Sequence, residues 1–105
     1  MTYPTHRQPS HPGFILKEDF IKPHNLTHAE VAKRLHVSFK SVSALVNERQ
    51  GISPEMAIRL GRLFGTSPEI WLNLQTAHDL WHIEHDGHSP ARDIRPLSLE
   101  TAGVP

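Results

Sequence analysis

The chain has 105 residues, of which 37% are hydrophobic and 21% charged, and it contains no cysteine. This length fits one domain with one core, and the lack of cysteine excludes disulfides, thiolate zinc sites and thiol nucleophiles. No apolar run approaches the roughly 20 residues of a membrane helix, and the N-terminus MTYPTHRQPSHPGF lacks a basic-then-apolar signal pattern. The sequence therefore predicts a cytoplasmic protein with no membrane partner.

The formal net charge is zero, which argues against nucleic acid because its binding proteins usually carry a basic surface. The total conceals a division along the chain. Residues 27–62 contain six Lys and Arg against three Asp and Glu, whereas residues 63–91 contain four acidic residues and no Lys or Arg. Such asymmetry is typical of two surfaces with different partners.

The first part of the chain is predicted to form an arm followed by a helix. Residues 1–10 are polar and contain two prolines, which indicates a flexible arm. A helix is expected over 12–21, because Pro12 suits its start and Pro23 pushes the preceding residue out of helical backbone. The core-facing side chains of this helix would be Leu16, Phe20 and Ile21.

Two short helices are expected next. Thr27 and Glu30 form a capping-box pattern directly before apolar residues, which predicts the start of the second helix. The pattern breaks at residues 36–37, and Ser38 then suits the cap of a third helix. Apolar residues at helical spacing define the buried faces of the two helices: Val31, Ala32 and Leu35 on the second, and Val42, Leu45 and Val46 on the third.

The fourth and fifth helices are expected to begin with the same sequence pattern, Ser-Pro-Glu. Ser53 and Ser67 are each expected to cap a helix with the hydroxyl, and each is followed by proline and then glutamate at the positive helix end. The fifth helix would run over 68–85. No segment alternates with period two over a sustained length, so the sequence predicts an all-α, five-helix domain over 11–86 and a short C-terminal tail over 87–105, either mobile or forming a short strand.

The second and third helices are separated by a turn of three or four residues, which is the spacing of a helix-turn-helix. The third helix would then enter the major groove, with Phe39 on a thymine methyl and Lys40 on a guanine edge or a phosphate. The full predicted DNA-binding set is His28, Ser38, Phe39, Lys40, Ser43, Asn47 and Arg49. A plain helical hairpin with a solvated polar face remains the alternative, because the spacing alone is weak evidence.

The run LTHAEVAKRLHVSFKSVSALVNERQGISPEMAIRL at 26–60 resembles the lambda-repressor-like (XRE-type) helix-turn-helix domain. Together with HPGFILKEDFIKP at 11–23 and GTSPEIWLNLQTAHDLW at 65–81, it is similar to the HigA (VapI-type) antitoxins. The resemblance implies a homodimeric repressor of its own operon that also neutralises a HigB-type toxin, a RelE-like ribonuclease that cleaves mRNA. It also implies that residues 38–47 form the recognition helix.

Two positions depart from the family pattern. The turn between the two helices often has glycine where this chain has His36, so a histidine would have to adopt a positive φ at some cost. The recognition helix often starts with a polar residue where this chain has Phe39. No operator sequence can therefore be transferred from the resemblance.

The fifth helix carries apolar residues on more than one side, which is typical of a helix buried on more than one side. One stripe, formed by Ile70, Leu74, Ala77 and Trp81, is the expected dimer interface. The alternative is a single wide core face. A dimer would place two recognition helices about 34 Å apart, the spacing that a palindromic operator requires.

Four histidines gather at the end of this helix: His78, His82, His85 and His88. His78 and His82 are spaced as in the zincin motif, with Asp79 in place of glutamate. A catalytic zinc needs a third ligand and a carboxylate base of the right reach, and the helix dipole already favours histidine there. The sequence therefore predicts no metal and no cofactor, with His78 and His82 as a remote metal-binding alternative.

The favoured interpretation is an antitoxin that acts by binding and not by catalysis. The acidic stretch 63–91 has two interpretations: a solvated surface, or a contact for a basic ribonuclease toxin. A stand-alone repressor of the same fold, without a toxin, is the main rival.

Overall fold

The computed structural model describes residues 8–87 and 91–98. The elements are α1 (Pro12–Ile15), η1 (Leu16–Ile21), α2 (His28–Leu35), α3 (Phe39–Val46), α4 (Pro54–Phe64) and α5 (Pro68–His85). The predicted all-α, five-helix fold is confirmed, with α1 and η1 forming the first helix; among the described residues there is no strand. Residues 1–7 of the expected arm, and 88–90 and 99–105 of the expected tail, lie outside the described residues. In the described part of the chain, no helix is long and apolar enough to span a bilayer.

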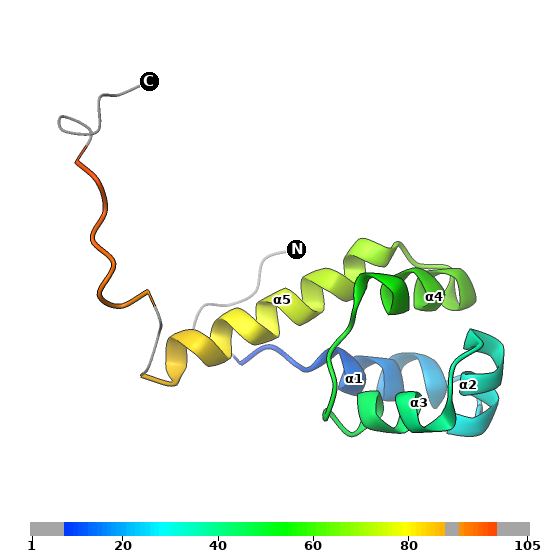
Figure 1. The fold of residues 1–105 in the computed structure, drawn as a ribbon. Coiled ribbons are helices and arrows are strands. Elements are labelled where there is room, and N and C mark those ends of the chain that lie inside the picture. The colour runs from blue at the N-terminus through cyan, green and yellow to red at the C-terminus, as the bar shows by residue number, and fades with distance from the viewer. Residues whose placement is uncertain (1–7, 88–90, 99–105) are drawn as a thin grey trace.

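The first four helices form a bundle, and α5 packs against it through α4 and α1. The C-terminal half of α5 extends beyond the other helices, and the segment before α1 runs alongside it (Figure 1). Thirteen buried apolar side chains make up the core: Leu16, Ile21, Val31, Ala32, Leu35, Val42, Leu45, Val46, Ile52, Met56, Ala57, Leu60 and Trp71. Because η1, α2, α3, α4 and α5 all contribute to this one cluster, the orientation of each of them depends on the others.

The first helix is not α-helical throughout, which corrects the expectation of one regular helix over 12–21. It begins as α1 and widens into the π-helical η1, where the Lys22 N–H donates to the carbonyl of Lys17, five residues back, at 3.1 Å. The wider turn allows Leu16 and Ile21 both to be buried in the core. The helix ends before Pro23, as predicted.

The Ser-Pro-Glu segments at the starts of α4 and α5 differ in their capping hydrogen bonds. At α4, the Ser53 hydroxyl accepts a hydrogen bond from the Met56 N–H at 3.1 Å. At α5, Ser67 occupies the N-cap position but its side chain makes no capping hydrogen bond, so the expectation of a hydroxyl cap there was wrong. Gly61 allows the loop before α5 to approach α4 closely, because a Cβ at this position would lie 2.6 Å from the carbonyl oxygen of Thr66.

Candidate nucleic-acid interface

The helix-turn-helix unit starts with a complete capping box. The Glu30 N–H donates to Thr27 Oγ1 at 3.1 Å, and the Thr27 N–H donates to Glu30 Oε1 at 2.8 Å. Hydrogen bonding of the Glu30 carboxylate to the Thr27 backbone, followed by hydrogen bonding to the Thr27 side chain, holds the pKa of Glu30 below its ordinary value. The reciprocal bonds fix where α2 begins, and with it the position of His28 in the first turn.

The turn between α2 and α3 depends on left-handed backbone at a non-glycine residue. His36 has φ 60° and ψ 43°, as the departure from the family pattern required. Its N–H and that of Val37 donate to carbonyls at the end of α2. From α4, Arg59 Nη1 donates to the carbonyl of Leu35 at 2.8 Å, so a cation also caps the negative end of α2.

The recognition helix α3 divides cleanly into two faces. Ser38 caps it, with the Ser41 N–H donating to Ser38 Oγ at 3.0 Å. Val42 and Leu45 are fully buried, whereas 56% of Phe39 is exposed. A large aromatic side chain this exposed, at the start of a short helix, is available for contact with a partner.

The structure brings most of the predicted DNA-binding residues to the exposed side of the helix-turn-helix. The ring of His28 lies 6.4 Å from that of Phe39, between centroids, so the first turns of α2 and α3 present one surface. Lys40 is exposed beside them and Ser38 precedes them. This surface joins an aromatic ring, a cation and an imidazole, which is the chemistry of a base-edge and phosphate contact.

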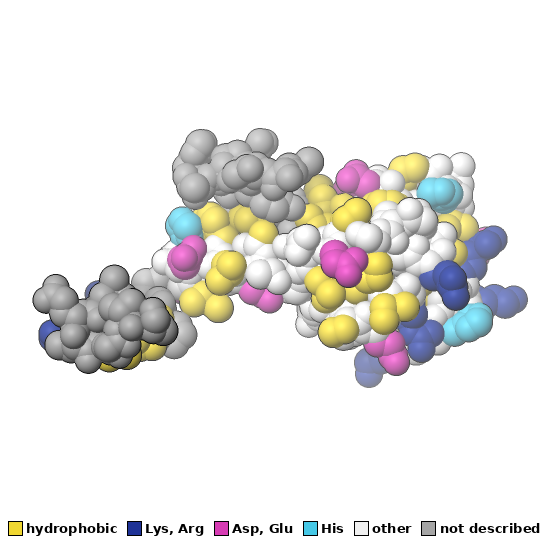
Figure 2. Space-filling model, turned by 90° about the horizontal axis from the view of Figure 1, so that it is seen from above, with side chains coloured by type: hydrophobic (Ala, Val, Ile, Leu, Met, Phe, Trp, Pro, Cys, Tyr) yellow, Lys and Arg dark blue, Asp and Glu magenta, His cyan; other side chains and the backbone are white. Residues whose placement is uncertain are grey.

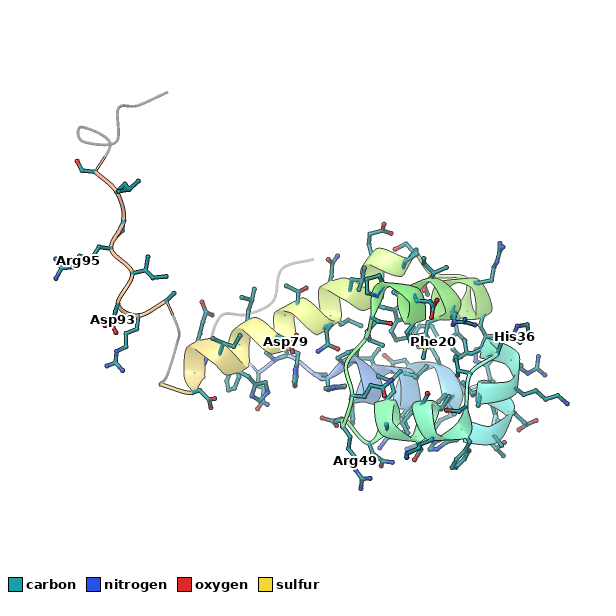
Figure 3. All side chains as sticks on the ribbon, in the orientation of Figure 1. Phe20, His36, Arg49, Asp79, Asp93 and Arg95 are labelled. Atoms are coloured by element: carbon teal, nitrogen blue, oxygen red, sulfur yellow. The ribbon has the colours of Figure 1, made fainter. Side chains whose placement is uncertain are left out.

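The other end of α3 is organised by Asn47. Its Nδ2 donates to the carbonyl of Ser43 at 2.8 Å and approaches Ser43 Oγ at 3.3 Å, so these two predicted contacts are tied together. Arg49 is exposed in the following loop and extends from the same side of the molecule as α3 (Figure 3). Its N–H donates to the carbonyl of Ala44 at 2.8 Å, which fixes the loop to the helix.

Two features of this region were not predicted from the sequence. Glu48 adopts φ 60° in the loop after α3, and no glycine or asparagine at that position signals a left-handed residue. The proximity of His28 and Phe39 joins two helices across eleven positions of sequence. Helical periodicity within one segment carries no information about such a pair.

Charge is divided between the ends of the molecule, as the sequence indicated. On the face shown in Figure 2, most Lys and Arg side chains gather at the end opposite the tail, and acidic side chains lie along α5 and on the adjoining body. Between α2 and α4, Arg34, Arg59 and Arg62 line one open groove. The neutral total is thus the sum of a basic helix-turn-helix end and an acidic α5.

The predicted dimer stripe on α5 is partly open. Ile70 is 47% exposed, and with Leu74 it lines a hollow shared with Ile15 and Phe20. Ala77 and Trp81 are half-buried. On other sides of the helix, Leu80 and Ile83 are exposed, whereas Trp71 is fully buried and donates to Thr66 Oγ1 at 2.8 Å. The exposed positions Ile70, Leu80 and Ile83 are available to a partner.

The histidines at the end of α5 lie against other aromatic rings. Rings of His78 and His82 lie 4.3 Å apart, and His85 stacks on Trp81 at 4.0 Å. Within residues 8–87 and 91–98, no group of three or more His, Asp or Glu is arranged to hold a metal ion. His88 lies outside the described residues.

Comparison with known proteins assigns the chain to a family. The helix-turn-helix family profile matches residues 17–71. Virulence-associated protein I of Dichelobacter nodosus is 44% identical over 94 residues, covering 90% of this chain and 86% of that protein. Antitoxin HigA-1 of Vibrio cholerae serotype O1 is 37% identical over 98 residues, covering 91% and 92%. The chain belongs to this helix-turn-helix antitoxin family.

A solved structure of the family has the same fold. The Pseudomonas aeruginosa antitoxin HigA with the higBA promoter aligns with a TM-score of 0.77 and 40% identity, covering 87% of this chain and 100% of that one. Family membership confirms the predicted resemblance and fold. It also agrees with an action by binding, because the family consists of DNA-binding regulators and not of enzymes.

Proposed function

We propose that the chain is an antitoxin that binds the operator of its own operon through α3 and represses it. The observation that carries this proposal is the exposed face of the helix-turn-helix, where Phe39 is 56% exposed beside Lys40 and His28. The related Pseudomonas aeruginosa antitoxin HigA was solved with the higBA promoter, so a protein of the same fold has promoter DNA as its partner. In this assignment Phe39, Lys40 and Ser43 contact bases, and His28, Ser38, Asn47 and Arg49 contact the backbone.

The proposal includes a homodimer. The apolar stripe of α5, in which Ile70 is 47% exposed, supplies a surface for a second copy, together with Leu74, Ala77 and Trp81. Two-fold symmetry would set the two recognition helices in successive major grooves and would require a palindromic operator. A dimer also doubles the phosphate contacts, which matters because each subunit offers few cations to DNA.

The second partner in the proposal is a HigB-like toxin. Its ribonuclease activity requires a basic surface for RNA, and the acidic side chains of α5, Asp79 and Glu84 among them, offer the complementary charge. The relatives named antitoxin support this assignment. Binding there leaves the exposed face of α3 free for DNA, so one complex can hold the toxin and the operator together.

Two experiments test the proposal. Hydroxyl-radical footprinting of the DNA upstream of the gene should show two protected half-sites about one helical turn apart. Co-expression with the neighbouring reading frame, followed by co-purification, should recover a small basic protein bound to this chain. Failure to protect any upstream DNA would refute the repressor, and a neighbour that never co-purifies would refute the antitoxin.

One alternative remains specific enough to test. A stand-alone repressor of the same fold would footprint in the same way, and relatives of the chain include a regulator of 45% identity from Escherichia coli that is named only as a helix-turn-helix transcriptional regulator. The distinguishing result is the growth of cells expressing the neighbouring reading frame alone. Arrest relieved by this chain supports the antitoxin, and normal growth supports the alternative.

A further inference from the structure

Three imidazole rings lie in a row where the segment before α1 crosses α5. The His11 ring lies edge-on to the His78 ring at 4.8 Å, and the His78 ring lies 4.3 Å from that of His82, measured between centroids. Gln8 Nε2 is 3.2 Å from His82 Nε2 at the exposed end of the row. His11, at the other end, is only 7% exposed. Neither operator contact nor the dimer stripe uses this cluster.

His11 performs a local task that depends on its protonation state. It is the N-cap of α1, and its Nδ1 accepts a hydrogen bond from the Gly13 N–H at 2.9 Å. An imidazole can accept through Nδ1 only when that nitrogen carries no proton. The usual caps, serine, threonine and asparagine, accept through oxygens that do not titrate in this range, so α1 begins with an unusual, titratable cap.

The turn that His11 caps supports the recognition helix directly. A Cβ on Gly13 would lie 1.8 Å from the carbonyl oxygen of Leu45, so the backbone of α1 touches the last turn of α3. The same carbonyl accepts the Glu48 N–H at 3.0 Å, at the start of the loop that carries Arg49. The position of the His11 turn is therefore transmitted to the end of α3 and to its following loop.

We propose that His11 is a positioning residue for the recognition helix, and that the row of His11, His78 and His82 makes operator binding weaken as the pH falls. Protonation of His11 removes its Nδ1 acceptor, and charge on neighbouring rings less than 5 Å apart adds repulsion. The turn then moves away from Leu45, and α3 loses its support. This inference rests on the proposed operator binding and assigns it a regulation.

The groups around His11 determine whether the capped turn is stabilised or destabilised as the pH falls. Burial, followed by the charge of His78, lowers the pKa of His11 from its ordinary value of 6.5; His82 acts in the same direction, whereas Glu48 and Asp79 oppose it. The turn capped by His11 therefore binds fewer protons when it is packed against Leu45 than when it has moved away. The packed turn has its full stability above the ordinary histidine pKa. It loses this stability as the pH falls through the lower pKa that His11 has in the folded state.

The operator binds the conformation in which the His11 turn packs against Leu45. The apparent affinity of the chain for the operator therefore falls in proportion to the fraction of protein in that conformation. With one linked proton, the decline approaches at most about tenfold per pH unit. Protonation of His28 at the DNA surface would act in the opposite direction by adding a positive charge near phosphates. A decline on acidification therefore cannot come from the DNA-facing histidine.

The test compares the native chain with His11→Asn, in which the asparagine oxygen can cap α1 without titrating. Affinity for a fragment of the DNA upstream of the gene is measured by fluorescence anisotropy from pH 8 to 5 at constant ionic strength. The native chain should lose affinity on acidification, whereas H11N should keep its neutral-pH affinity and lose the decline. The matched control is His24→Asn, an exposed histidine outside the row, which should retain the native profile.

Nuclear magnetic resonance on the DNA-free chain gives a second readout. The amide signals of Gly13 and of residues 45–49 should titrate together with the His11 ring in the native chain and stay unchanged in H11N. Equal native affinity across the pH range, an unchanged decline in H11N, or amides at 45–49 that ignore the His11 titration would each overturn the inference. Absence of DNA binding at every pH would instead refute the proposed operator binding, and the amide titration would still decide the structural coupling.

Discussion

Single residues in this chain work through backbone contacts as much as through side chains. His36 closes the turn of the helix-turn-helix in a left-handed conformation that histidine adopts at some cost. Gly13 allows α1 to approach the carbonyl of Leu45 so closely that no side chain fits between them. The HPG segment, which contributed to the resemblance in the sequence, is thus explained by one cap and one helix contact.

The first prediction concerns Gly13→Ala. The new Cβ would meet a backbone oxygen, which cannot move aside as a side chain can, so we expect the free energy of unfolding to fall by roughly 1–3 kcal/mol, as for other overpacked sites. Urea denaturation followed by circular dichroism measures it. Gly51→Ala is the matched control, because the new Cβ would meet only the end of the Gln75 side chain, and it should cost less. Equal losses would contradict the reported α1–α3 contact.

At the scale of elements, the starts of helices were predictable and their interior geometry was not. Thr27, Ser38 and Ser53 cap the helices that their patterns indicated, because a cap depends on residues three positions apart. The π-helical η1 depends on burying Leu16 and Ile21 against distant elements. For the same reason the proximity of His28 and Phe39, and the row of histidines from two segments, were not predicted.

A second prediction separates the two Ser-Pro-Glu starts. Ser53→Ala removes the hydroxyl that accepts the Met56 N–H, so we expect a loss of about 1 kcal/mol in the free energy of unfolding. Ser67→Ala removes a hydroxyl that makes no capping bond, so its effect should be a few tenths of a kcal/mol at most. Thermal unfolding of both variants measures the difference. A larger loss at position 67 would show that Ser67 caps α5 in solution.

On the scale of the whole molecule, the zero net charge conceals a separation of positive and negative side chains between two parts of the chain. The helix-turn-helix end is basic and α5 is acidic (Figure 2). This division places the proposed DNA surface and the proposed toxin surface on different parts of the chain. The apolar side chains exposed on α5 offer the surface through which two copies would associate in the proposed homodimer.

The third prediction tests that association. Trp81→Ala should weaken dimerisation by about tenfold or more, because large aromatic side chains dominate such contacts. Sedimentation equilibrium across low micromolar concentrations measures the dissociation constant. Ile58→Ala serves as control, because Ile58 is 60% exposed on α4, away from the stripe, and should leave the constant unchanged. A Trp81 variant as dimeric as the native chain would remove this residue from the interface.

In the proposed function, the exposed face of α3 reads the operator. The most direct test is a gel-shift titration of the upstream DNA with Phe39→Ala, Lys40→Ala and, as control, Lys22→Ala, an exposed cation that precedes the helix-turn-helix. Each of the first two variants should bind about 5- to 100-fold more weakly, the cost of one base contact, while light scattering shows an unchanged dimer. Native affinity in both variants would show that the exposed face of α3 does not read the operator.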